Sequence, residues 1–277
     1  MTGRWSFKGP NPITGYTVGL ELSAHLLPDV VAQVSALGPA LANDLPRKAE
    51  QSGLSFPMPF PLPRTPQVGP RQLFGVVFDE LDRDGTVLKQ LSVQANVVTY
   101  MTLRYERWKE YWPVAERILK QVAGVVMPRI SVSAFVLNAT NRFALEGNQA
   151  DIPIDQLIRK GSKYISPDML SKKAPCHCLY GFLLQSNQPP GTRIDNLNIS
   201  IGGTEAEGRH YWADITISFR LLMKSPISDT SILFGDEEGP DSAAGIFQKL
   251  HEANNMLFAD VLKQEICRNI PGLPHAH

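Results

Sequence analysis

One short segment of the chain carries residue types that bind metals in other proteins, the Cys-His-Cys sequence at 176–178. Two cysteines two positions apart in a strand point to the same side of a sheet, and the histidine between them points to the other side. A structural zinc site normally needs two ligand pairs with turn-type spacing. No second pair lies nearby, and the only other candidate ligands are Cys267, His275 and His277. We therefore predict no metal site and no cofactor, and we interpret Cys176 and Cys178 as core residues.

Other patterns that would indicate catalysis are weak or missing. His251-Glu252 has no second histidine four residues on, so the metalloprotease pattern is absent, and the sequence contains neither a Walker-type phosphate loop nor a Gly-x-Ser-x-Gly elbow. We interpret His251 as a solvated residue or a partner for a carbonyl group. Paired carboxylates can divide acid and base roles between them. Four carboxylates could face one another across neighbouring predicted strands and turns: Asp195, Asp214, Glu205 and Glu207.

The polar faces of the predicted strands are unusually neutral. Ser, Thr, Asn and Gln dominate them. A water-facing sheet usually carries Lys, Glu and Arg, which prevent its edge strands from pairing with another chain. A neutral lining is typical of a polar cavity wall or of a face covered by another layer, and a solvated sheet with short side chains is the alternative. The candidate ligand-binding residues on these faces are Asn96, Asn198, Asp214, Thr216, Ser218 and Arg220.

Hydrophobic periodicity predicts the strands that would position these residues. Apolar residues alternate at 16–22, 74–81, 87–103, 130–138, 176–184, 194–201 and 211–222. The polar turn 82–85 (Asp-Arg-Asp-Gly) joins the second and third of these strands into a hairpin. In the long strand 87–103, the odd-numbered residues from Leu91 to Leu103 are predicted to face the core.

Helical spacing predicts the remaining elements. A first helix spans 26–51, limited by Pro39 and Pro46, and a second begins near Pro113 after a separate helical turn at 105–112. A short helix follows at 154–160. The closing helix, with its apolar stripe at 246–262, comes after an acidic loop at 228–242 and is capped by Asp241 or Ser242.

A proline-rich strap occupies residues 56–70, where prolines alternate with Phe, Met and Leu. Alternating prolines favour polyproline II and supply no regular donor ladder. The strap is either an extended crossover whose apolar side chains pack on the core, or a docking segment for a partner.

These elements predict an α+β fold in a single domain, 1–277. About seven strands would form one extended, curved antiparallel sheet with helices packed on one face. The order of elements is similar in residues 13–128 and 129–270, so these stretches are candidate pseudo-repeated halves, although their side chains do not repeat clearly.

Composition narrows the class of partner. The chain has 277 residues, and 27 Lys and Arg balance 27 Asp and Glu. A nucleic-acid-binding protein usually shows a basic excess or a basic stripe, so this balance argues against nucleic acid. Three cysteines do not suit a disulfide framework and indicate a reducing compartment, and no apolar run reaches membrane-spanning length. We expect a soluble cytoplasmic protein without a membrane partner.

Three segments resemble a sporadically distributed bacterial family of conserved hypothetical proteins. They are 100–108 (Tyr-Met-Thr-Leu-Arg-Tyr-Glu-Arg-Trp), 129–132 (Arg-Ile-Ser-Val) and 250–258 (Leu-His-Glu-Ala-Asn-Asn-Met-Leu-Phe). The chain departs from the family at 136–139, where Val-Leu-Asn-Ala stands in place of the usual Arg-Tyr-x-Asn-like strand. The resemblance implies no catalytic residue. The scattered distribution of the family is similar to that of accessory genes in defence and toxin-linked loci.

The sequence thus favours a non-enzymatic binding protein that acts through the polar face of its sheet. We expect a protein partner or a sequestered small ligand, and a second copy of the chain is a further candidate partner. The resemblance adds the expectation of an accessory role in a bacterial defence or toxin-linked system. The alternative is an enzyme with a small-molecule pocket on the polar face, using Asp214, Arg220 or His177.

Overall fold

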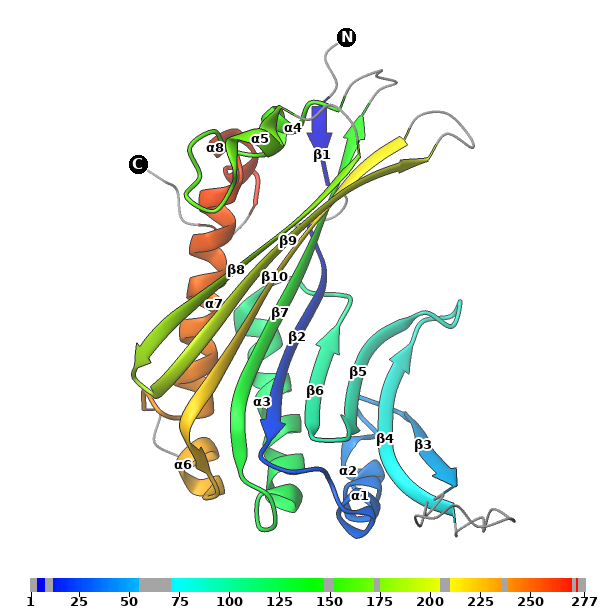
Figure 1. Ribbon diagram of the computed structural model, residues 1–277. Coiled ribbons are helices and arrows are strands. Elements are labelled where there is room, and N and C mark those ends of the chain that lie inside the picture. The colour runs from blue at the N-terminus through cyan, green and yellow to red at the C-terminus, as the bar shows by residue number, and fades with distance from the viewer. Residues whose placement is uncertain are drawn as a thin grey trace, which may run out of the picture.

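Ten strands form one antiparallel sheet in the computed structural model, and the long helices lie behind it in Figure 1. The structure describes residues 4–7, 12–54, 71–146, 152–171, 175–204, 210–235, 239–270 and 273. The proline-rich strap, Glu205, Glu207 and the two C-terminal histidines lie outside these residues. The strands are β1 (Arg4–Ser6), β2 (Ile13–Leu22), β3 (Arg47–Leu54), β4 (Arg71–Leu81), β5 (Val87–Gln94), β6 (Val97–Thr102), β7 (Val132–Glu146), β8 (Cys176–Asn187), β9 (Pro190–Thr204) and β10 (His210–Ile227).

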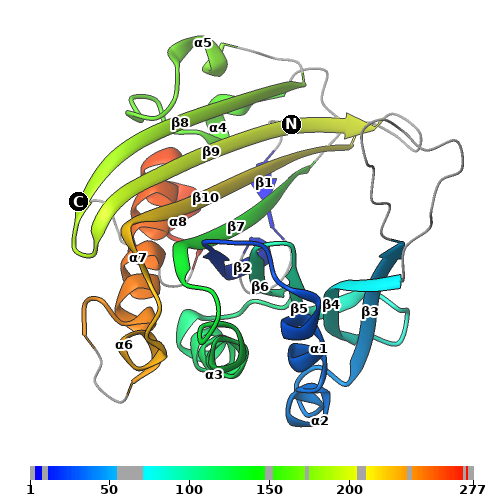
Figure 2. The ribbon, with the colours of Figure 1, turned by 60° about the horizontal axis from the view of Figure 1, so that its bottom comes forward.

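Three longer helices cover one face of the sheet. α1 (Pro28–Ser35) packs on β4, while α3 (Trp108–Val126) and α7 (Ala243–Val261) pack on the central strands. Figure 2 shows these three helices together on the same side of the sheet. The shorter helices are α2 (Gly38–Leu41), α4 (Ile154–Leu157), α5 (Pro167–Leu170), α6 (Thr230–Phe234) and α8 (Gln264–Cys267). The predicted α+β class, with an antiparallel sheet and helices on one face, is confirmed.

The strands are arranged similarly in the two candidate halves of the chain, 13–128 and 129–270. The strand order runs β3-β4-β5-β6-β2-β7-β10-β9-β8, and β1 pairs with the end of β7. In each half, the first strand lies against the last one: β2 against β6, and β7 against β10. The two first strands, β2 and β7, pair antiparallel at the centre. Along this path the first half contributes five strands, β3 to β6 and β2, and the second half contributes four, β7 to β10.

The prediction of about seven strands was wrong, and one cause is a tight turn inside the predicted strand 87–103. Gln94 pairs with Val97, so the chain reverses at Ala95 and Asn96, with Ala95 at φ 52°. The turn also shifts which residues are buried. In β6 the buried side chains are even-numbered, Val98, Tyr100 and Thr102, and not the predicted odd-numbered ones. Alternation continues across Ala95-Asn96 without a Gly or Pro to mark the turn, so the pattern alone resembled one long strand.

The other two missed strands have weak apolar patterns. β1 has only three residues. β3 is an edge strand that begins with Arg47 and Lys48, and its residues 47–51 overlap the end of the predicted helix 26–51. That helix is in fact two short helices, which end at Leu41.

The remaining local predictions had mixed outcomes. The turn at 82–85 is confirmed, with Asp82 Oδ1 accepting hydrogen bonds from the amides of Asp84 and Thr86 and with Gly85 at φ 82°. Ser242 caps α7 by accepting from the Gly245 amide. The predicted break before Pro113 is wrong, because α3 is continuous from Trp108. Pro113 is exposed, so its ring lies away from the core while it removes one backbone donor.

One core lies between the sheet and the helices. It contains the even-numbered residues of β2, the odd-numbered residues of β7 and β10, and the apolar stripes of α3 and α7. Aromatic side chains concentrate at its centre, where Tyr16 stacks on Tyr105 at 4.4 Å between centroids and Trp108 stacks on Trp112 at 5.3 Å. None of the described helices combines the length and apolar character needed to cross a membrane.

Candidate functional site

The face of the sheet opposite the helices, here called the open face, collects most of the predicted site residues. Strand register places side chains in rows across β8, β9, β10 and β7. Three of these rows are His177-Ser200-Asp214-Arg142, Leu179-Asn198-Thr216-Thr140 and Gly181-Asn196-Ser218-Asn138. At roughly 4.8 Å per strand, the nine-strand path from β3 to β8 is about 38 Å wide.

Five of the six predicted site residues share this face on two neighbouring strands. Asn198 lies on β9, and Asp214, Thr216, Ser218 and Arg220 lie on β10. Thr216 Oγ1 is 3.2 Å from Thr140 Oγ1. Asn96 does not join them, because it lies in the β5–β6 turn, where its Nδ2 donates to the Leu22 carbonyl at 3.4 Å.

Three ion pairs lie on the open face. Asp214 accepts two hydrogen bonds from Arg142, at 2.6 and 2.7 Å, and these hydrogen bonds raise the pKa of Arg142. Arg220 donates to the carboxylate of Glu21 from Nε at 2.8 Å and from Nη2 at 2.6 Å. Near the far edge, Arg47 pairs with Asp79 at 3.1 Å. Three arginines and three carboxylates therefore cancel in charge.

The arrangement does not assemble a hydrolytic triad, although it contains the three residue types. His177, Ser200 and Asp214 lie in one row on β8, β9 and β10. In a Ser-His-Asp triad the histidine lies between the serine and the carboxylate. Here the serine is in the middle, and both carboxylate oxygens of Asp214 bind Arg142.

The predicted pairing of carboxylates was wrong for the two that the structure describes. Asp195 lies on the helix side of β9, whereas Asp214 lies on the open face of β10. The pleat places alternate residues on opposite faces. Asp195 stands opposite Phe219, and Asp214 stands opposite Ser200, so the two carboxylates cannot meet.

Two amide oxygens on the open face have no hydrogen-bond partner among the described residues. The Oδ1 atoms of Asn138 and Asn198 are shielded from solvent and accept no hydrogen bond from any described residue. Shielded acceptors normally have a partner, either in the protein or in an ordered water. They are therefore available to an added donor.

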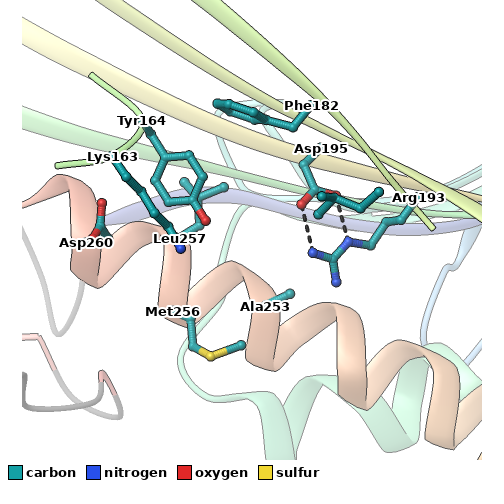
Figure 3. A pocket seen from close by; sticks show the side chains of 10 residues that line it. Lys163, Tyr164, Phe182, Arg193, Asp195, Ala253, Met256, Leu257 and Asp260 are labelled. Carbon is teal, nitrogen blue, oxygen red and sulfur yellow. Dashed lines mark hydrogen bonds and ion pairs between the residues drawn. The ribbon is translucent and has the colours of Figure 1, made fainter. Parts of the chain in front are cut away.

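A groove on the helix side is a second candidate site, which we call the α7 groove (Figure 3). It encloses about 540 Å³ between α7 and the strands β8 and β9. Its lining residues are Lys163, Tyr164, Phe182, Leu184, Arg193, Asp195, Ala253, Met256, Leu257 and Asp260. An adjoining cavity of about 300 Å³ shares Arg193, Ala253 and Met256 and extends the groove along α7.

An ion pair lies in the α7 groove. Arg193 donates to both oxygens of Asp195, at 2.7 and 2.8 Å, and its guanidinium lies 5.5 Å from the centroid of the Phe219 ring. Burial raises the pKa of Asp195, while the hydrogen bonds from Arg193 act in the opposite direction. Sequence reasoning missed this groove, although Arg193 and Asp195, two apart on one strand, were a usable signal. Nothing comparable marks Tyr164 or Met256, which come from distant segments.

His251 belongs to the aromatic cluster of the core, so its prediction as a solvated residue was wrong. Its Nδ1 is 2.9 Å from the Tyr16 hydroxyl, and its Nε2 is 3.2 Å from Asn255 Nδ2. Its ring stacks on Trp108 at 4.5 Å between centroids. Burial lowers the pKa of His251 to about 4, against an opposing effect of Glu252. The imidazole is therefore neutral at ordinary pH and joins α7 to β2.

The Cys-His-Cys segment divides between the two faces of β8. Cys176 and Cys178 are half-buried on the helix side, and His177 is exposed on the open face. In the described part of the chain, no three His, Cys, Asp or Glu side chains come close enough to hold a metal ion.

No protein-family model matches the chain, and no curated protein matches it.

Proposed function

We propose that the chain is a non-enzymatic binding protein that uses its open face to bind a protein partner. The observation that carries this proposal is the pairing of charges on a wide sheet face that the long helices leave uncovered. Phosphate recognition needs cations that are not already neutralised. A neutral face of this width suits a protein surface better than nucleic acid.

The other side chains on this face support the same partner class. Aliphatic residues such as Val136 and Met101 lie among short hydroxyl and amide residues such as Ser218 and Asn196. Protein interfaces are similarly mixed, and the cores of their contact patches are depleted in charge. The unpartnered oxygens of Asn138 and Asn198 would accept hydrogen bonds from the partner.

We further propose a cytoplasmic, accessory role in a bacterial defence or toxin-linked system. The low cysteine count supports a reducing compartment. The family resemblance at 100–108, 129–132 and 250–258 supports the accessory role.

A lysine at the centre of the open face tests the proposal. A partner captured from cell extract with the wild-type chain would be purified, and its affinity would be measured for wild type, Thr216→Lys and Leu27→Lys. Leu27 is exposed at the start of α1, so Leu27→Lys adds the same charge away from the face. Because Thr216 lies on a face that the described helices leave uncovered, Thr216→Lys should change the free energy of unfolding by no more than about 0.5 kcal/mol.

We expect Thr216→Lys to lower the affinity for the partner by at least about tenfold, since an unpaired ammonium would be buried in the contact. Leu27→Lys should bind like wild type. Equal affinity of Thr216→Lys and wild type would remove the open face as the binding surface.

The α7 groove favours a second candidate, a small-molecule site. Its volume of about 540 Å³ lies within the range of ligand pockets, and a buried ion pair among apolar walls is a common way to orient a ligand. This replaces the expectation of a pocket on the polar face, because the groove lies on the helix side. Met256→Trp should fill the groove and abolish any ligand-induced rise in melting temperature, while Thr216→Lys should leave that rise unchanged.

A further inference from the structure

The two edges of the sheet differ in how they are protected. At one edge, β3 carries Arg47, Lys48 and Glu50, all exposed. At the other edge, the twelve residues of β8 (CHCLYGFLLQSN) include no Asp, Glu, Lys, Arg or Pro. Charged residues and prolines are the usual devices that prevent an edge strand from pairing with another chain. The β8 edge lacks these devices, whereas the β3 edge has them.

β8 also exposes large apolar side chains. Leu179 is 66% exposed and Leu183 is 73% exposed on the open face, and Leu184 is exposed on the helix side. These are three of the eight large apolar residues that are exposed in the described part of the chain. Large exposed apolar side chains that gather on one strand indicate an interaction surface.

The backbone along the outer edge of β8 can form hydrogen bonds with another strand. Along residues 178–187, β8 pairs with β9 on one side and makes no backbone–backbone hydrogen bond to any other described segment. Tyr164 and the Ser166 amide contact the side chains of Phe182 and Tyr180, which lie on the helix side. The strand order adds a second indication. β4 has β3 as its outer neighbour, but β8, which occupies the same place on the other side of the centre, has none in the described sheet.

We propose that β8 pairs antiparallel with β8 of a second copy of this chain, about a two-fold axis at Gly181. Such an axis, perpendicular to the sheet, keeps open face with open face and helix side with helix side. Paired residue numbers then add up to twice the number of the residue on the axis.

The sequence of β8 is self-complementary in this register. Leu179 faces Leu183 of the other copy twice, once on each side of the axis. On the helix side, Tyr180 faces Phe182 of the other copy, and Cys178 faces Leu184. Aromatic and aliphatic cross-strand pairs are the favourable units of sheet stability. An axis at Leu183 would instead leave Leu179 opposite Asn187, so the axis at Gly181 pairs the exposed leucines best.

The pairing would join two sheets edge to edge. Both open faces would then lie on the same side, so the proposed partner-binding surface would be continuous across the dimer. The surface that forms the dimer, the β8 edge, is separate from Thr216, so failure of either proposal leaves the other one standing.

Sedimentation of the purified full-length chain tests the pairing, with wild type compared with Leu183→Lys and Leu27→Lys. Leu183→Lys places a charge at the edge, as β3 does naturally, and should raise the dimer dissociation constant at least about tenfold. Leu27→Lys adds the same charge at an exposed site on the helix side and should leave the dimer intact. Circular dichroism and melting temperature would verify that both variants fold.

A crosslink tests the register. Gly181→Cys places one cysteine from each copy on the axis, and mild oxidation should convert the chain to a disulfide-linked dimer. A Cβ at Gly181 meets only the Asn196 Oδ1, at 3.3 Å, which belongs to a flexible side chain. In this register Cys176 faces Ser186 and Cys178 faces Leu184, so wild type serves as a control that should not crosslink.

The combined outcomes decide the proposal. A dimer that Leu183→Lys dissociates and Gly181→Cys crosslinks would support it. A wild-type chain that stays monomeric at about 100 µM would overturn it, because a specific interface should associate at such concentrations. A dimer that survives Leu183→Lys, or one that Gly181→Cys fails to crosslink, would also overturn the β8 pairing.

Discussion

Acidification should destabilise the folded chain through His251. In the folded state this imidazole is half-buried beside Trp108 and hydrogen-bonded to Tyr16 and Asn255, and burial lowers its pKa from 6.5 to about 4. In the unfolded chain the same group has its ordinary pKa. Between pH 6.5 and pH 4 the unfolded state therefore binds more protons, and the free energy of unfolding falls as the pH falls.

The size of this loss follows from the difference between the two pKa values. A pKa lowered from 6.5 to about 4 corresponds to about 3 kcal/mol, lost across that window. Well above pH 6.5 the imidazole is neutral in both states and adds no pH dependence. Exposed carboxylates such as Glu50 and Asp229, whose pKa values are lowered, also lose stabilising interactions in acid. Their effect is common to all the variants compared below.

Urea denaturation at a series of pH values would measure the effect in wild type, His251→Gln and His25→Gln. Glutamine retains a hydrogen-bonding group near the Tyr16 hydroxyl but does not titrate, so His251→Gln should have a flatter pH profile than wild type. His25 is exposed, and its replacement controls for the loss of a histidine. Parallel profiles for wild type and His251→Gln would refute the reasoning, because the proton uptake would then belong to other groups.

Three further predictions follow from the packing and the chemistry of single sites. Trp112→Ala should lower the free energy of unfolding by about 3–5 kcal/mol, since Trp112 is buried against Trp108 and Phe247; a urea-measured loss under about 1 kcal/mol would place it outside the core. Purified protein should contain no stoichiometric zinc by elemental analysis, because Cys178 and His177 point to opposite faces of β8; one zinc per chain that disappears in Cys178→Ser would contradict this. Arg193→Leu should cost about 3 kcal/mol in thermal or chemical unfolding by leaving the buried Asp195 carboxylate unpaired, and Arg193→Leu/Asp195→Leu should recover most of it; an equal loss in both variants would show that the charge is not the cause.

The sequence alone determined the features that depend on neighbours along the chain. Alternation in 16–22 and 211–222 identified β2 and β10 and their buried sides, because the side-chain period of a strand is local. The turn at 82–85 and the cap at Ser242 were also readable, since each depends on a few adjacent residues. For the same reason, Asn198, Asp214, Thr216, Ser218 and Arg220 could be assigned to polar faces before their strands were placed side by side.

The tertiary structure decided what depends on register and on segments far apart in the chain. The partner of Arg220 is Glu21, which lies 199 positions away, and the partner of Tyr16 is His251, which lies 235 positions away. The α7 groove exists only where α7 passes β8 and β9. The β5–β6 turn escaped detection because Ala95 adopts a left-handed conformation that its residue type does not favour, so packing of the flanking strands overrides local preference there. The face that stays uncovered was likewise fixed by where α1, α3 and α7 pack, since a strand's polar side has no local signal that distinguishes water from a partner.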